Sequence, residues 1–399
     1  MIQAPPSVDQ VFELLRAVID PELGADIVSL GMVPGVTVSP EGDVIVGVKL
    51  TIGGCPLRAQ IKKDVESRVA VHPGVRDVRI EWGEMNSEER TDVMLKARWS
   101  AREQAPATAV SLTTRVLAIA SGKGGVGKSA VTVNLAAAVA AQGFTVGVLD
   151  ADIWGFSVPR LLGIDEPLEA QRVEGSDKPK IIPNELPVGP KSRGGLLKVV
   201  STCFLVEEGT ALMWRGLMLT KAVEQFLHDV EWGELDYLFI DMPPGTGDVQ
   251  MGLARMLPRT DLLIVTTPAL AAQKVAARAA DMARRSFLRV CGVIENMSTF
   301  TCDHGETYTL FGEGGGQLLA DEIGVPLLGQ IPLEAAVSVG GDAGVPVSLA
   351  GKGKAADEFR AIAQRIVDEV APPTNMAGCS ARMLNLAAAA LDAHDAPAK

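Results

Sequence analysis

Short apolar runs recur along the chain from about residue 115 to residue 370, and segments with helical spacing lie between them. This alternation of strand and helix patterns predicts an α/β fold with a doubly wound, mostly parallel sheet that has helices on both faces. The expected strands are 116–119, 145–149, 237–240, 262–266, 290–294 and 327–331. All of them would belong to one large domain.

A smaller pattern of helices and strands precedes this one. Apolar residues between positions 11 and 19 have helical spacing, and the helix that they predict ends at Asp20-Pro21. The expected elements are a helix at 11–19, strands at 36–38 and 44–50, a helix at 56–71 and a strand at 75–80. Together they predict a small α/β domain at the start of the chain.

Breaks in these patterns divide the chain. Residues 86–111 are polar, with Ala, Gln and Pro near their end, which is typical of a linker with some helix. Periodicity is lost again at Pro372-Pro373, and the Ala-rich tail that follows lacks the basic face of a membrane anchor. We expect a small domain at 1–85, a linker at 86–111, the large domain at 112–371 and a tail at 372–399.

The composition limits the class of protein. A chain of 399 residues that is 47% hydrophobic can bury a sizeable core. Its net charge of -12 argues against a general binder of nucleic acid or of anionic membranes. Because the sequence shows neither a signal peptide nor an apolar run long enough to span a bilayer, we expect a cytoplasmic protein. Its five scattered cysteines fit reduced thiols better than disulfides.

A glycine-rich loop follows the first strand of the large domain. It reads Gly-Lys-Gly-Gly-Val-Gly-Lys-Ser and has the G-x-x-x-x-G-K-S spacing of a phosphate-binding loop. Its glycines let successive backbone N–H groups converge on phosphate oxygens at the start of a helix. Lys128 supplies positive charge to the β- and γ-phosphates, and the Ser129 hydroxyl can bind Mg²⁺. The expected nucleotide-binding residues are Gly122, Lys123, Gly124, Gly125, Val126, Gly127, Lys128 and Ser129.

Carboxylates follow two of the expected strands. Asp241 closes one apolar run, and Asp150 and Asp152 come directly after another. Because ligands bind at the carboxyl ends of parallel strands, we expect these side chains near the phosphate loop. Asp241 would then hold the shell of a Mg²⁺ ion through water. A helix cap for Asp241, or a turn-forming pair for the other two, is the alternative interpretation.

A second lysine, Lys123, stands at the front of the loop. In this the loop resembles the deviant phosphate loop of the MinD/ParA/ArsA and nitrogenase-reductase group, whose members hold nucleotide between two subunits. The resemblance implies an ATP-linked homodimer in which Lys123 reaches the partner subunit's phosphates. It also implies that Asp152 positions the attacking water and that Asp150 supports the metal shell. Asn296 and Pro332 resemble the residues that contact the adenine, with a backbone turn as the competing explanation for both.

Further segments narrow this resemblance to one family. They are 123–129, 150–159, 213–216, 232–237, 241–248, 295–298 and 311–316. Taken together they look like the Mrp/ApbC iron-sulfur cluster carriers, which are P-loop ATPases that form homodimers. Residues 20–33 and 50–58 look like the small N-terminal domain found on iron-sulfur assembly factors. Cys55 matches the reactive cysteine of that domain, and a buried structural thiol is the alternative reading.

One departure of the sequence from the family matters more than the others. Many members carry C-x-x-C shortly after Glu-Asn-Met-Ser, and two subunits together hold one [4Fe-4S] cluster with four thiolates. Here the corresponding stretch contains Cys302 and His304 but no second cysteine. A cluster across the dimer would use two Cys302 thiolates with His304 or an outside ligand. Alternatively, Cys302 and His304 are ordinary loop residues.

The resemblance leads to one functional hypothesis and its rivals. We expect a Mg²⁺-dependent, ATP-hydrolysing homodimer that carries iron-sulfur clusters to client apoproteins, with assembly factors as further partners and without nucleic acid or membrane. Lys123, Lys128 and Asp152 would be its catalytic residues. The rivals are a metal-free, ATP-gated adaptor in cluster assembly and a MinD/ParA-like positioning ATPase. A nitrogenase-reductase-like electron carrier fits least, because too few cysteines match.

Overall fold

The computed structural model describes residues 4–20, 23, 25–51, 58–103, 105–152, 157–172, 179–189, 194–205, 216–245, 247–286 and 288–373. Contacts between residues divide the chain into two compact units. The first consists mainly of residues 1–106, and the second contains most of residues 107–399. The division falls within the segment that the sequence predicts to be a linker.

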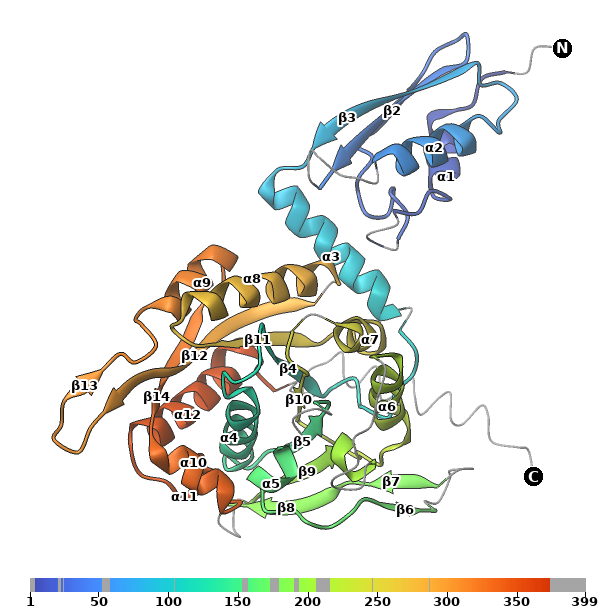
Figure 1. Ribbon diagram of the computed structural model, residues 1–399. Helices are drawn as coiled ribbons and strands as arrows, with labels where there is room; N and C mark the ends of the chain where they lie inside the picture. Colours follow the sequence, from blue (N-terminus) through green and yellow to red (C-terminus); the bar gives the residue numbers. More distant parts are fainter. Residues whose placement is uncertain are drawn as a thin grey trace, which may run out of the picture. The chain divides into compact units, whose positions relative to one another are not determined.

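A three-stranded sheet and two helices form the body of the first unit (Figure 1). The elements are α1 (Val8–Leu15), β1 (Gly35–Val38), β2 (Asp43–Leu50), α2 (Arg58–Val69) and β3 (Asp77–Glu84). Strand β2 pairs antiparallel with β1 and parallel with β3. Every second side chain of β2 is buried, in one core with Ile61, Val65 and Val69 of α2. The predicted elements are therefore present, although α1 ends at Leu15, several residues before Asp20.

Helix α3 (Ser87–Glu103) occupies most of the segment that we expected to be a linker. Glu88 and Glu89 lie in its first turn, where negative charge is favourable at a helix N-terminus. Val93 and Ala97 are buried in the core of the first unit. The polar composition of this segment therefore conceals a narrow apolar face, which makes the helix part of the first unit.

The second unit is built on a nine-stranded sheet, mostly parallel, as the alternating pattern predicts (Figure 1). Its strands are β4 (Arg115–Ser121), β5 (Thr145–Asp150), β8 (Asn184–Val188), β9 (Gly195–Ser201), β10 (Tyr237–Asp241), β11 (Asp261–Thr266), β12 (Arg289–Thr301), β13 (Thr307–Tyr308) and β14 (Leu327–Leu333). Their order is β13-β12-β11-β4-β10-β5-β9-β8, with β14 also paired to β12. Strands β8 and β13 pair antiparallel, and the others pair parallel. Strands β6 (Glu169–Gln171) and β7 (Lys180–Ile182) pair antiparallel in a separate two-stranded sheet.

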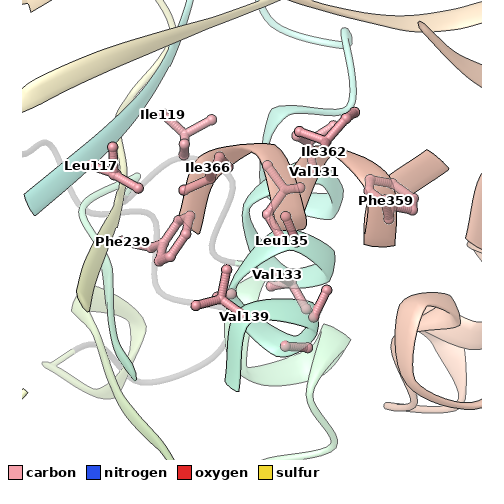
Figure 2. Close-up of a cluster of buried hydrophobic side chains, with 14 of the residues drawn as sticks. Leu117, Ile119, Val131, Val133, Leu135, Val139, Phe239, Phe359, Ile362 and Ile366 are labelled. Atoms are coloured by element: carbon pink, nitrogen blue, oxygen red, sulfur yellow. The ribbon is translucent and has the colours of Figure 1, made fainter. Parts of the chain in front are cut away.

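Helix α4 (Lys128–Ala140) is buried on nearly all sides. Figure 2 shows its Val131 and Leu135 among side chains from β4, β10 and the C-terminal helix α12 (Lys354–Arg365). The other helices of this unit are α5 (Val158–Leu161), α6 (Gly216–Asp229), α7 (Asp248–Met256), α8 (Leu270–Arg285), α9 (Gly315–Ile323), α10 (Ala335–Asp342) and α11 (Val347–Ala350), with a 3-10 turn at Thr202–Leu205 and a π turn at Ile366–Val370. None of the helices in the described part of the chain combines the length and apolar character needed to cross a bilayer. The central place of α4 fixes its first turn beside the carboxyl ends of β4 and β10.

Side chains at the opposite, amino-terminal edge of the sheet hold the last described residues. Arg289 of β12 donates to the Val370 carbonyl over 2.9 Å. The Tyr237 hydroxyl of β10 donates to the Ala371 carbonyl over 2.9 Å, and Arg115 of β4 donates to the Pro372 carbonyl over 2.7 Å. Side chains from the starts of β12, β10 and β4 thus anchor the end of the compact unit. The predicted tail beyond residue 373 lies outside the described residues.

Candidate nucleotide-binding site

The phosphate loop joins the end of β4 at Ser121 to the start of α4 at Lys128. Gly125 and Gly127 have φ values of 80° and 78°, in the left-handed region that glycine adopts most easily. The loop forms one wall of a cavity of about 450 Å³ at the carboxyl ends of the parallel strands. A cavity of this size suits a small ligand such as a nucleotide. The lining residues are Ser121, Lys123, Gly124, Gly125, Val126, Gly127, Lys128, Ser129, Ala130, Asp152, Ser157, Leu161 and Pro244.

At two positions of the loop, other elements approach so closely that a residue with a side chain would collide with them. A Cβ atom on Gly122 would lie 2.3 Å from the backbone nitrogen of Ala276 in α8. A Cβ atom on Gly127 would lie 2.3 Å from Nδ2 of Asn296. Gly122 was expected to bind nucleotide, but it is not among the described residues that line the cavity. The absence of a Cβ lets α8 approach the loop, and the expected contact of Gly122 with nucleotide stays a prediction.

The first turn of α4 and the end of β10 form the polar centre of the site. Lys128 Nζ lies 2.8 Å from Oδ1 of Asp241, and the Ser129 hydroxyl donates to Oδ2 of the same carboxylate over 2.5 Å. The Asp241 side chain is fully buried, and that of Lys128 is almost so. Burying a charge is costly unless it is paired and hydrogen-bonded, and both conditions are met here.

Asp152 and Asp150 have different surroundings. Asp152 lines the cavity, and its Oδ2 lies 3.5 Å from Lys128 Nζ. Asp150 instead accepts hydrogen bonds from the Asp152 backbone N–H over 3.1 Å and from the Ser201 hydroxyl over 2.9 Å. Burial, and next the charge of Asp241, raises the pKa of Asp150 to about 7, against the lowering effect of these two hydrogen bonds. Asp150 thus supports the site from behind, and Asp152 faces the cavity.

The donor set of the site fits a magnesium ion. Hydroxyl and carboxylate oxygens of Ser129, Asp241 and Asp152 meet at one edge of the cavity, and hard oxygen ligands are those that Mg²⁺ prefers. Two carboxylates face one ammonium group here, so the cluster has an excess of negative charge. The ammonium of Lys128 already occupies a position that both carboxylates make favourable for a cation.

Asn296 supports the phosphate loop directly. Its side-chain amide donates to the Val126 carbonyl over 2.9 Å. The next residue, Met297, has a φ of 57°, which is strained for a side chain of this kind. Pro332 lies in β14 and is half-buried. Neither Asn296 nor Pro332 is among the described residues that line the cavity, so their expected contact with a base stays a prediction.

Lys123 belongs to neither ion pair of this cluster of charges. It is exposed and lines the cavity. Among the residues that the structure describes, none forms an ion pair with it. The expected reach of Lys123 to the phosphates of a second subunit stays a prediction.

Cys302 and His304 lie in the turn between β12 and β13. The Cys302 backbone N–H donates to the Glu306 carbonyl over 2.9 Å, which closes the hairpin, and His304 is exposed at its tip. The structure brings these two residues together on one turn. Within its described residues the structure shows no group of three or more His, Cys, Asp or Glu side chains placed to hold a metal ion. Cys55 lies outside the described residues.

The sequence reasoning missed two residues of the site. Thr132, one turn after Lys128 in α4, donates to Asp241 over 2.8 Å. Ser201, at the end of β9, donates to Asp150. The spacing of four residues between Lys128 and Thr132 was a usable signal, because such residues share a helix face. Ser201 gave no local signal, since its contact depends on the pairing of β5 with β9.

The fold and the site define a class of protein. The class is that of P-loop nucleotide-binding proteins. Its features here are a mostly parallel sheet, a glycine loop at a helix N-terminus and a lysine beside two carboxylates. The comparisons with known proteins specify the class further. A family model described as NUBPL iron-transfer P-loop NTPase matches residues 113–367, and one described as iron-sulfur cluster assembly protein matches residues 8–82.

Curated relatives cover most of the chain. An iron-sulfur cluster carrier protein of Mycobacterium tuberculosis is 46% identical over 343 residues, which are 84% of this chain and 86% of the relative. The protein of the same name from Deinococcus radiodurans is 43% identical over 369 residues, 92% of this chain and 96% of the relative. A solved nucleotide-binding protein from Archaeoglobus fulgidus, in complex with ADP, aligns with a TM-score of 0.50 and 32% identity, over 66% of this chain and 96% of that one.

The chain therefore belongs to the family of iron-transfer P-loop NTPases and carries an N-terminal iron-sulfur cluster assembly domain. The resemblance to iron-sulfur cluster carriers and the α/β fold class are both confirmed.

Proposed function

We propose that the protein is a Mg²⁺-dependent ATPase that works as a homodimer and carries iron-sulfur clusters to client apoproteins in the cytoplasm. The observation that carries this proposal is the meeting of Lys128, Ser129 and Asp241 at the head of α4, beside a cavity lined by the phosphate loop. The names of the curated relatives support the cargo. In this proposal residues 1–85 form the assembly-type domain and residues 112–371 the ATPase, joined by 86–111 and followed by a tail at 372–399.

Hydrolysis would depend on positioning and on charge stabilisation. The loop N–H groups and Lys128 would hold the β- and γ-phosphates, and Lys123 would reach the phosphates bound by the second protomer. Asp152, which faces the cavity, would orient the attacking water. Asn296 and Pro332 would contact the adenine.

The metal would be held by this chain's own oxygen atoms. Ser129 would bind it directly, Asp241 would hold its shell through water, and Asp150 would support that shell from the neighbouring strand. When bound, Mg²⁺ neutralises negative charge that develops on the phosphates. For this the Lys128 ammonium must leave Asp241 and turn to the phosphates.

Replacing Lys128 tests the ATPase. We expect Lys128→Ala to lower the rate of phosphate release from ATP by about a hundredfold or more, because it removes a charge aimed at the transferred phosphate. Lys352→Ala, which removes an exposed lysine of the same unit, serves as the control and should hydrolyse like wild type. Thermal unfolding of both variants shows whether they are folded. A folded Lys128→Ala protein with undiminished hydrolysis would refute the site.

Anaerobic reconstitution tests the cargo. Wild-type protein treated with iron and sulfide should take up a [4Fe-4S] cluster shared by two protomers, as counted by iron and sulfide per dimer and by the absorption spectrum. Cys302→Ala should lose it, and Cys291→Ala, which removes a buried thiol from the preceding strand β12, should keep it. A cluster absent from all three proteins, with hydrolysis intact, would instead favour a metal-free adaptor.

A further inference from the structure

The Asp241 carboxylate accepts hydrogen bonds from three side chains of one helix. Oδ1 lies 2.8 Å from Lys128 Nζ and 2.8 Å from the Thr132 hydroxyl, and Oδ2 lies 2.5 Å from the Ser129 hydroxyl. All three donors belong to the first two turns of α4. Asp241 is fully buried, so each bond replaces one that water would otherwise make.

Two of the three donors have a second task in the proposed function. Lys128 must turn to the phosphates and Ser129 to the metal, and both line the cavity. Thr132 is fully buried and is not among the described lining residues. It therefore has no competing ligand, and it is the donor that stays on Asp241 when the other two are engaged.

The Thr132 hydroxyl has one proton and two possible acceptors. The Lys128 carbonyl lies 3.0 Å away and Asp241 Oδ1 2.8 Å away. An ionised carboxylate accepts the stronger hydrogen bond, and the Lys128 carbonyl is also the acceptor for the helix backbone one turn later. The carboxylate is thus the preferred partner. A bond to Oδ1 fixes the rotation of the carboxylate and leaves Oδ2 directed at the Ser129 hydroxyl.

We propose that Thr132 is a positioning residue, which holds the Asp241 carboxylate in one orientation so that its second oxygen can hold the shell of Mg²⁺. The inference rests on the proposed Mg²⁺-dependent nucleotide site and extends it by one residue. Removing the Thr132 hydroxyl should therefore weaken the effect of Mg²⁺ on nucleotide binding and hydrolysis. It should leave nucleotide binding in the absence of Mg²⁺ unchanged.

Three variants test the role of the hydroxyl. Thr132→Val keeps the shape of the side chain and removes the donor, and Thr132→Ser keeps the donor. Thr114→Val is the matched control, because Thr114 is also buried but donates to the backbone carbonyl of Leu235. Nucleotide affinity is measured with a fluorescent ATP analogue in Mg²⁺ and in EDTA, and the Mg²⁺ concentration that gives half-maximal hydrolysis is measured in parallel.

We expect Thr132→Val to raise the half-saturating Mg²⁺ concentration about tenfold, as the loss of a hydrogen bond to a charged group would. It should also lose most of the gain in nucleotide affinity that Mg²⁺ gives, with affinity in EDTA unchanged. Thr132→Ser and Thr114→Val should resemble wild type in both assays. If Thr132→Val does not fold, Thr132→Ala replaces it with the same expectations.

Two results would overturn the inference. One is a folded Thr132→Val protein with the Mg²⁺ dependence of wild type, and the other is a Thr132→Ser protein as impaired as Thr132→Val, which would indicate packing instead of hydrogen bonding. A wild-type protein without Mg²⁺-dependent nucleotide binding would refute the proposed function itself. The two failures are therefore distinguishable.

Discussion

Asn296 and Gly127 show how closely single residues are fitted around the phosphate loop. The Asn296 amide reaches the Val126 carbonyl, and it can do so only because Gly127 has no side chain. Met297, next in the chain, keeps a strained backbone conformation at the same contact. A strained backbone conformation persists only where contacts with the surrounding structure hold it. We therefore expect β12 and the phosphate loop to hold each other in place.

Replacing Gly127 tests this contact. Gly127→Ala puts a Cβ in the left-handed region, at a cost of about 1–2 kcal/mol, and also 2.3 Å from the Asn296 amide. We expect lower thermal stability and an ATP affinity that falls by about tenfold or more. Gly324→Ala, after α9, is the control, since Gly324 also has a left-handed φ, of 65°, but a Cβ there meets nothing within 4 Å. Equal affinities of the two variants would contradict the fit described here.

What could be predicted at this scale depends on the distance along the chain between the partners. The loop, Lys128 and Ser129 were recognisable because their spacing is local. That Lys128 bonds to Asp241 in this structure, and that Gly122 serves the approach of α8, could not be read from the sequence. Both depend on elements more than a hundred residues away along the chain.

Among the secondary-structure elements, the buried strands were the most predictable. Strands β5 and β11 match their expected ranges to within one residue, because continuous apolar runs mark strands covered on both faces. Strand β12 extends to Thr301, well past its apolar run, because β13 and β14 supply hydrogen-bond partners for its polar half. The pattern did not predict β8 or β9 at all.

One buried hydroxyl is among the groups that hold the end of the C-terminal helical segment. Tyr237→Phe removes the hydrogen bond to the Ala371 carbonyl, and both residues are buried. We expect the free energy of unfolding to fall by about 1 kcal/mol. The other tyrosine gives a matched control, because Tyr308 is 46% exposed and its hydroxyl donates to the exposed Glu306. Chemical denaturation should show a loss for Tyr237→Phe and none for Tyr308→Phe.

At the scale of the whole molecule, the chain joins two units with separate cores, one for each of the two family matches. The net charge of -12 is spread over a chain whose phosphate loop is locally basic. A second protomer that brings its own Lys123 would add positive charge where a bound triphosphate carries negative charge. ATP is therefore expected to favour the homodimer.

Lys123 tests that expectation. We predict that Lys123→Ala binds ATP with nearly the affinity of wild type, because Lys128 and the loop are unchanged, but neither dimerises on ATP addition nor hydrolyses it at the wild-type rate. Sedimentation velocity with and without ATP measures the first effect and phosphate release the second. Lys352→Ala should behave as wild type. If Lys123→Ala formed dimers on ATP addition at the same protein concentration as wild type, the proposed role of Lys123 in dimerisation would be contradicted.

The anchoring of Val370, Ala371 and Pro372 has a practical consequence for experiments on this protein. These carbonyls are held at the amino-terminal edge of the sheet, and the cavity opens at the carboxyl-terminal edge. A fluorophore or surface tether joined beyond residue 373 therefore starts from the side remote from the nucleotide. Single immobilised molecules could then exchange ligand and meet a second protomer without obstruction by the support.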